Sequence, residues 1–193
     1  MTLSPEQCRQ IPLGAMGRNC LIHQTVQFFN PSQVFLGQNV RIDCFCILSA
    51  GPEGLYIGDH VHIAAGCYLF GGGGKILLED FSGLAPRVSL FTASDDFTEG
   101  YLLGPCIPDS YRKVTRGNVT LRVNAGAGAG SVVLPGVTIG VNARIGALTV
   151  AGKDVPDHEL VAGNPPRRVA RRSATLYREL IDRFQREQQP DER

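Results

Sequence analysis

Residues 36–50, LGQNVRIDCFCILSA, place a branched aliphatic residue at every sixth position. The same period returns along most of the chain, and only Ala127 departs from Leu, Ile or Val at these places. The first positions of the hexads are Leu36, Ile42, Leu48, Ile57, Ile63, Leu69, Leu78, Leu84, Leu90, Leu121, Ala127, Val133, Ile139 and Ile145. A period of six cannot keep an apolar stripe on one face of an α-helix, which turns about every 3.6 residues. The spacing therefore indicates a fold built from repeats.

The fifth position of each hexad is restricted to small or β-branched residues. These are Val40, Cys46, Val61, Cys67, Ser82, Val88, Ser94, Ala125, Ser131, Val137, Ala143 and Thr149. A short strand and turn that stacks on a copy of itself needs one large aliphatic and one small residue pointing inward on each side. The pattern therefore predicts an all-β fold, a parallel β-helix of hexapeptide repeats, over residues 18–170.

Interruptions of the period predict the corners of the coils and one insertion. Leu36, Ile57 and Leu78 recur at twenty-one residues, so we expect a coil of eighteen residues plus a three-residue corner. Glu53 and Asp95 share the phase of Gly74, and we expect these corner residues to stack as a ridge. The repeat disappears over residues 97–118, which predicts an inserted loop, and a loop of this length in a compact domain is usually functional.

Both ends of the chain predict helices, and we expect residues 1–193 to form a single domain. Ser4 followed by Pro5 indicates the start of a short N-terminal helix. An apolar stripe predicts a C-terminal helix over residues 174–188 that caps the stack of coils. The stripe consists of Leu176, Leu180, Ile181 and Phe184.

Composition excludes several classes of partner. The formal net charge of +1 gives no overall field for a nucleic acid or a membrane surface. The six cysteines have neither zinc-site nor disulfide-framework spacing, residues 1–11 lack a leader pattern, and no apolar run could span a bilayer. We therefore expect a cytoplasmic protein without nucleic acid or membrane partners. Zinc would need converging histidines, and the four present have poor spacing for it.

Residues 130–140, GSVVLPGVTIG, and residues 162–167, AGNPPR, resemble the hallmark of bacterial hexapeptide-repeat acyltransferases. The resemblance implies a left-handed β-helix, a homotrimer, and acyl-CoA as co-substrate, with acetyl-CoA as the first candidate and no metal required. Residues 40–49 and several residues of the inserted loop are similar to one subfamily, the N-acyltransferases of nucleotide-linked 4-amino-4,6-dideoxy sugars. The loop residues are Asp95, Asp96, Phe97, Gly104, Pro105, Pro108, Tyr111 and Val114.

The subfamily implies acylation of an aminosugar for surface polysaccharide such as the O-antigen of lipopolysaccharide. Related sequences are saccharide O-acetyltransferases, so transfer to a hydroxyl stays open as an alternative. A third alternative is a β-helix that is not an acyltransferase, such as a zinc hydratase or a structural, ice-binding surface. The flat threonine arrays of an ice-binding surface are absent from the sequence.

Three residues are catalytic candidates: Asp95, Asp96 and His62. Saccharide O-acetyltransferases of the superfamily use a histidine base, but residues 90–97 contain none and Asp95 stands there. A carboxylate is a weak base for a sugar hydroxyl, yet it can orient a sugar amine and take its proton, which favours N-acylation. Alternatively, the two aspartates only cap a turn. His62 closes a hexad and faces outward, where the resemblance implies substrate contact; the other interpretation is an ordinary surface histidine.

The binding candidates follow from the resemblance. Arg87 is expected to hold the sugar diphosphate, or else to form a surface ion pair, and Tyr111 and Lys113 are further substrate-binding candidates. Ala85 stands where relatives often have serine, which puts the exact sugar in doubt. The family places pantetheine between neighbouring subunits. We expect the basic residues at the open end of the stack to contact the coenzyme A phosphates; alternatively, these residues only form a solvated basic patch. The corresponding residues are Ala129, Ala147, Lys153, Asn164, Arg167 and Arg168.

Overall fold

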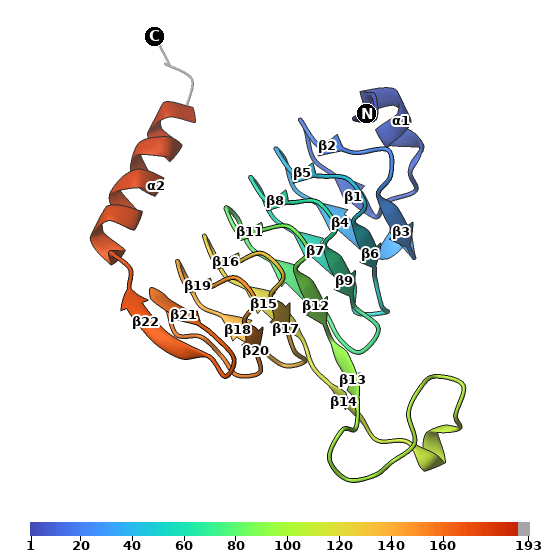
Figure 1. Ribbon diagram of the computed structural model, residues 1–193. Coiled ribbons are helices and arrows are strands. Elements are labelled where there is room, and N and C mark those ends of the chain that lie inside the picture. The colour runs from blue at the N-terminus through green and yellow to red at the C-terminus, as the bar shows by residue number, and fades with distance from the viewer. Residues whose placement is uncertain (189–193) are drawn as a thin grey trace.

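The computed structural model describes residues 1–188, in which short strands stack into a three-sided β-helix (Figure 1). Each side of the prism is one sheet, and its strands are parallel except for β22. The first sheet contains β1 (Ala15–Met16), β4 (Val34–Leu36), β7 (Leu55–Ile57), β10 (Ile76–Leu78), β15 (Val119–Leu121) and β18 (Thr138–Ile139). The second contains β2 (Leu21–Ile22), β5 (Arg41–Ile42), β8 (His62–Ile63), β11 (Gly83–Leu84), β16 (Gly126–Ala127), β19 (Arg144–Ile145), β21 (Glu159–Ala162) and β22 (Arg167–Arg171). The third contains β3 (Gln27–Phe29), β6 (Ile47–Ser49), β9 (Tyr68–Phe70), β12 (Ser89–Phe91), β17 (Val132–Val133) and β20 (Val150–Ala151).

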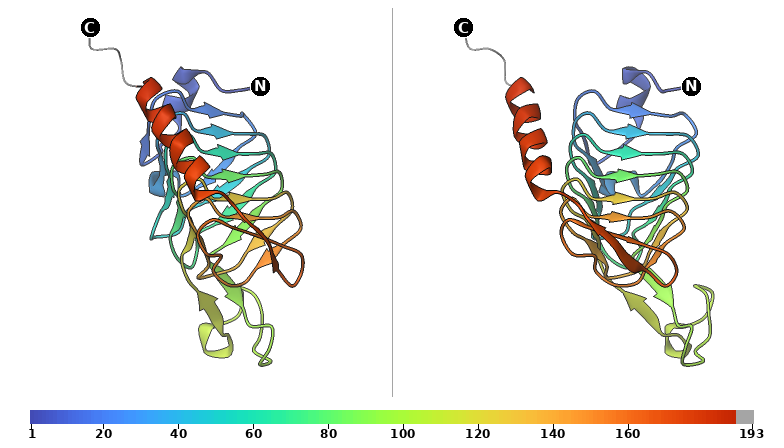
Figure 2. Two further views of the ribbon diagram at one scale, coloured as in Figure 1. Left: turned by 90° about the vertical axis from the view of Figure 1, so that its left-hand side faces the viewer. Right: turned by 60° about the vertical axis from the view of Figure 1, so that its left-hand side comes forward.

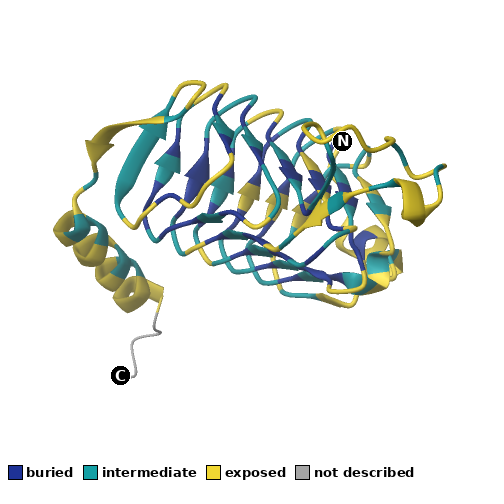
Figure 3. Cartoon of the chain, turned by 90° about the horizontal axis from the view of Figure 1, so that it is seen from below, coloured by how far each residue is buried: buried dark blue, intermediate teal, exposed yellow. Residues whose placement is uncertain are grey.

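The core runs along the axis of the prism (Figure 3). Every first-position residue of the hexads is at most 4% exposed, so the predicted fold class is confirmed. The fifth-position residues are at most 2% exposed, except Ser94, which lies outside the coils. Leu48, Leu69 and Leu90 pair in register in successive coils. Each such buried side chain stabilises the fold by about 1.5–3 kcal/mol, so the repeated aliphatic position is the main source of stability.

The insertion in the fourth coil is an antiparallel hairpin of β13 (Ala93–Asp95) and β14 (Val114–Arg116), with a 3-10 turn at Asp109–Tyr111. It projects from the stack (Figure 1). The coil closes behind it because the Gly117 N–H donates to the Thr92 carbonyl oxygen at 3.0 Å, and β10 pairs directly with β15. The insertion therefore starts a few residues before the predicted position 97.

The predicted ridge of Glu53, Gly74 and Asp95 is wrong. Gly74 packs against Gly117 and Asn118, and the Asn118 side chain accepts a hydrogen bond from the Lys75 N–H at 2.8 Å. Asp95 has already left the stack in β13. Constant spacing in the sequence does not reveal the residue at which a chain leaves a repeat.

A short N-terminal helix, α1 (Pro5–Gln10), packs at the first coil and buries Cys8 in the core. Ser4 and Gln7 form a capping box, which satisfies two free N–H groups at the helix start. The predicted N-terminal helix is confirmed.

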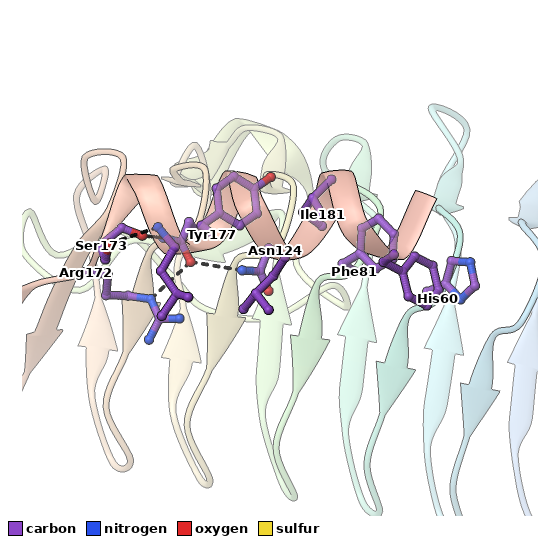
Figure 4. Close-up of a pocket in the computed structure, with 11 residues that line it drawn as sticks. His60, Phe81, Asn124, Arg172, Ser173, Tyr177 and Ile181 are labelled. Atoms are coloured by element: carbon purple, nitrogen blue, oxygen red, sulfur yellow. Dashed lines mark hydrogen bonds between the residues drawn. The ribbon is translucent and has the colours of Figure 1, made fainter. Parts of the chain in front are cut away.

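The C-terminal helix α2 (Ala174–Gln188) does not cap the stack as predicted. It runs beside the coils, over the corner between the first and second sheets (Figure 2). Phe184 packs edge-on against His60 and Phe81, with ring centroids 5.0 and 5.4 Å apart, yet no residue of α2 is buried. Between helix and corner lies a cavity of about 480 Å³ (Figure 4). The β21–β22 hairpin already pairs at the last coil, so the helix turns back along the flank.

Candidate active site

The hairpin holds Asp95 in a defined orientation. Asp95 lies opposite Val114 in the β13–β14 ladder. Its Oδ1 accepts a hydrogen bond from Arg112 Nη2 at 3.1 Å, and its Oδ2 accepts one from the Gly104 N–H at 3.3 Å. The side chain is 25% exposed, so substrate can still reach it. Sequence reasoning did not select Arg112, because no period connects it to Asp95 across the insertion.

Asp96 is engaged by its own loop. Its carboxylate accepts hydrogen bonds from the N–H groups of Thr98, Glu99 and Tyr101 and from the Thr98 hydroxyl. Loss of hydration opposes the shift, but the N–H groups of Glu99 and Thr98 together with the other donors hold the pKa of Asp96 below its ordinary value. This is the geometry of a turn-capping aspartate.

Tyr111 and Lys113 lie in the same inserted segment as Asp95. Tyr111 is 60% exposed and borders an open hollow of about 510 Å³ together with Tyr101. The Lys113 ammonium contacts the Glu99 carboxylate, which raises the pKa of Lys113. The insertion therefore groups aromatic rings and charged side chains around the strand that carries Asp95.

His62 forms a pair with Asp43 on the outer face of the second sheet. His62 Nε2 lies 2.8 Å from Asp43 Oδ2, and Arg41 Nε donates to Asp43 Oδ1 at 2.7 Å. Burial opposes the shift, but the hydrogen bonds from His62 and Arg41 hold the pKa of Asp43 below its ordinary value. Sequence reasoning missed Asp43, although the twenty-one-residue coil was a usable signal because it places Arg41 beside His62.

A shallow groove of about 390 Å³ lies beside His62 and contains Ala85. Gly83 and Gly126 occupy the neighbouring outward positions of the second sheet, so no side chain fills the groove there. Arg144 bounds the far side and donates to the Asn124 carbonyl oxygen. Burial, and to a lesser degree the charge of Arg172, lowers the pKa of Arg144 to about 10.

Arg87, Ala129 and Ala147 lie along one edge of the prism, the corner between the second and third sheets. Arg87 is exposed and adopts a left-handed backbone conformation, with φ of 62°. The Leu148 N–H donates to the Ala129 carbonyl oxygen at 2.9 Å, which joins successive coils at this corner. A Cβ at Gly128 would lie 2.4 Å from the Ala147 nitrogen, so the coils approach closely there.

The last coil brings three donor-binding candidates together. Lys153, Asn164 and Arg167 border one cavity of about 400 Å³. Arg168 does not border it; its Nε lies 3.5 Å from Glu159 Oε1. The cavity therefore offers two cations and one amide to an anionic ligand, beside the carboxylate of Asp154, which accepts a hydrogen bond from the Thr138 N–H.

One chain does not unite His62 with Asp95. The hairpin leaves at the corner between the third and first sheets, whereas His62 lies on the second sheet, which is the opposite side of a three-sided prism.

Across residues 1–188 the side chains form no cluster of three or more potential metal ligands, and no helix is suited to span a bilayer.

Comparisons with known proteins give a consistent result, although no family model matches the sequence. The chain is 32% identical over 170 residues to dTDP-4-amino-4,6-dideoxy-D-glucose acyltransferase of Escherichia coli, which covers 88% of each protein. A crystal structure of an aspartate-to-alanine variant of AntD, an N-acyltransferase from Bacillus cereus, in complex with dTDP and coenzyme A, superposes with a TM-score of 0.90. Identity to it is 34%, over 96% of this chain and 98% of that chain. AntD with dTDP and 3-hydroxybutyryl-CoA gives a TM-score of 0.88 at 33% identity, over 96% and 97% of the two chains.

Proposed function

The chain belongs to the family of nucleotide-aminosugar N-acyltransferases, and on this premise we propose that it transfers an acyl group from acyl-CoA to the amino group of a nucleotide-linked 4-amino-4,6-dideoxy sugar. Acetyl-CoA is the first candidate donor, and a dTDP-linked sugar is the first candidate acceptor. The observation that carries the proposal is the near full-length match to the AntD N-acyltransferase. The ordered, accessible carboxylate of Asp95 supplies the chemistry that an amine acceptor needs.

In the proposed reaction, the amine nitrogen attacks the thioester carbonyl carbon. A C–N bond forms, the C–S bond breaks, and its electron pair leaves with the sulfur of coenzyme A. The nitrogen must lose a proton, which Asp95 accepts and the departing thiolate finally takes up. A positioned carboxylate suits this step because an amine needs orientation and proton removal in the transition state more than a strong base.

The binding candidates divide into two groups in this proposal. Arg87, Tyr111 and Lys113 contact the nucleotide sugar, while Ala129 and Ala147 leave room for pantetheine. Lys153, Asn164 and Arg167 hold the phosphates of coenzyme A in the end cavity. Arg168, paired with Glu159, adds to the basic surface there, and Asp96 shapes the loop around Asp95.

We also propose a homotrimer, because the proposed site is incomplete in one chain. A neighbouring copy would bring its second sheet, with His62, to the hairpin that carries Asp95. The outer face of the third sheet and its corner with the second sheet offer apolar surface for such contacts, namely Phe29, Phe45, Tyr68, Phe70 and Leu148, which are 36% to 76% exposed. A monomer with full turnover in sedimentation and activity measurements would contradict the trimer.

The remaining parts of the proposal concern the whole chain. Residues 1–188 form one domain, residues 189–193 of the predicted domain lie outside the described residues, and the protein acts in the cytoplasm, where nucleotide sugars for surface polysaccharide would be modified. The test is thiol release from acetyl-CoA with dTDP-4-amino-4,6-dideoxyglucose or with the matching sugar that carries a 4-hydroxyl. We expect turnover with the amine, and turnover with the hydroxyl sugar alone would reject the proposal.

One observation favours O-acetylation as a second candidate function. The His62–Asp43 pair, 2.8 Å apart, has the arrangement of a histidine base oriented by a carboxylate, and it borders the groove that contains Ala85. In the second candidate, His62 would deprotonate a sugar hydroxyl. His62→Gln separates the two functions, because it should abolish transfer to a hydroxyl, whereas transfer to an amine would lose one substrate contact and still turn over through Asp95.

A further inference from the structure

Arg112 differs from the other paired arginines of residues 1–188. Its side chain is 13% exposed, whereas the other arginines in ion pairs are 48% to 66% exposed. Its Nη2 lies 3.1 Å from Asp95 Oδ1 and its Nη1 lies 3.6 Å from Asp109 Oδ1. An exposed ion pair contributes little, but a largely buried guanidinium is held in place by its partners.

The Arg112–Asp95 pair leaves part of the guanidinium unsatisfied. Arg112 Nε is buried and has no hydrogen-bond partner within residues 1–188. An unpaired buried donor destabilises a fold, and an apolar residue of similar volume often replaces a buried ion pair without loss of stability. Folding alone therefore does not explain a guanidinium at this place. The pair acts on the one carboxylate to which the proposed function gives a chemical role.

The two contacts to Asp95 fix its direction. The β13–β14 ladder sets its backbone opposite Val114, Arg112 holds Oδ1, and the Gly104 N–H holds Oδ2. An ionised carboxylate has about four lone-pair sites, so two remain for a ligand. Because both oxygens are fixed, the remaining lone pairs keep one direction relative to the hairpin.

We infer that Arg112 is a positioning residue for acyl transfer, which aims the Asp95 carboxylate at the sugar amine. The inference rests on the proposed function and names a residue that the reaction needs but that does not itself touch the reacting atoms. Without the guanidinium, the Asp95 side chain rotates among its staggered conformers. A misplacement of about 1 Å lowers the rate by up to about 100-fold.

The test compares Arg112→Met and Arg112→Lys with the control Arg116→Met. Arg116 is an exposed arginine on the same hairpin, opposite Ala93, and in the described part of the chain the Asp95 carboxylate pairs with Arg112 and Gly104 instead. We expect Arg112→Met to lower kcat about 10- to 100-fold with KM for acetyl-CoA unchanged, Arg112→Lys to recover part of the loss, and Arg116→Met to match the parent. If the methionine variant does not fold, Arg112→Gln replaces it and the same loss is expected.

A double-mutant cycle with Asp95→Asn identifies the route of the effect. If Arg112 acts through Asp95, the double variant Arg112→Met with Asp95→Asn is no slower than Asp95→Asn alone. Losses that multiply, or an Arg112→Met enzyme with the parent kcat, would overturn the inference while the proposed function stands. An Asp95→Asn enzyme with the parent kcat would remove Asp95 from the proposed chemistry, and the positioning role would fail with it.

Discussion

Replacing Asp95 with asparagine is the perturbation that the structure predicts in most detail. Both carboxylate oxygens accept hydrogen bonds, one from Arg112 and one from the Gly104 N–H. An asparagine side chain has one acceptor and one NH₂ group, so in either orientation it places a donor against a donor. The lost charge-assisted hydrogen bond costs about 1.5–3 kcal/mol locally. No residue from 93 to 118 belongs to the hydrophobic core of the coils, so this cost stays within the hairpin and the unfolding temperature of the coils should not change.

The effect of Asp95→Asn on catalysis should be larger than its effect on structure. Loss of a positioned proton acceptor lowers kcat about 10²- to 10⁴-fold, or about 3–5 kcal/mol. The assay is thiol release from saturating acetyl-CoA with the nucleotide aminosugar, together with titration of coenzyme A to measure Kd. Coenzyme A affinity should be unchanged, because none of its proposed contacts, at Ala129 and Ala147 and in the end cavity, lies on the hairpin that carries Asp95. Glu53→Gln is the control, since Glu53 is an exposed corner carboxylate away from the hairpin. Parent kcat in Asp95→Asn would refute the reasoning.

Three further predictions concern the fold and its charges. The pKa of Asp43 is lowered in the folded protein, so its pairing with His62 and Arg41 stabilises the fold above the ordinary carboxyl pKa of about 3.9 and stops doing so as pH falls through the lower folded pKa. Urea unfolding should therefore show Asp43→Asn less stable than the parent at pH 7 and equally stable at the acid limit. Equal stability at pH 7 would contradict this. Gly51→Ala should destabilise the protein by about 1–3 kcal/mol, because its Cβ would lie 2.0 Å from the Gly71 carbonyl oxygen, whereas Gly72→Ala meets nothing within 4 Å and should be nearly neutral. Phe184→Ala should speed tryptic cleavage within α2 while the coils keep their unfolding temperature, and unchanged cleavage would show that the aromatic contact does not hold the helix.

The coil was predictable because its information is local. The six residues of one hexad are enough to predict that Leu69 or Ile63 points into the core, and each further coil stacks the same pattern on the last. The left-handed sense and the trimer did not follow from spacing; they came from the resemblance carried by residues 130–140 and 162–167.

The parts that spacing missed depend on contacts between distant segments. Arg112 meets Asp95 only because the chain leaves the stack after Thr92 and returns at Gly117, a hairpin that no period announces. The stripe of α2 indicated an apolar face but not the surface it meets, which the β21–β22 hairpin decides by turning the chain back along the flank. The contact between His62 and Asp43 could have been predicted. Adding one coil length to Arg41 gives His62, and Asp43 follows Arg41 by only two residues.

The most direct test of N-acylation is the nature of the bond in the product. The enzyme is incubated with acetyl-CoA and dTDP-4-amino-4,6-dideoxyglucose, and the product is weighed by mass spectrometry before and after mild hydroxylamine treatment, which cleaves esters and spares amides. We predict a mass gain of one acetyl group that survives the treatment. An acetyl group that hydroxylamine removes would place the transfer on a hydroxyl and contradict this account.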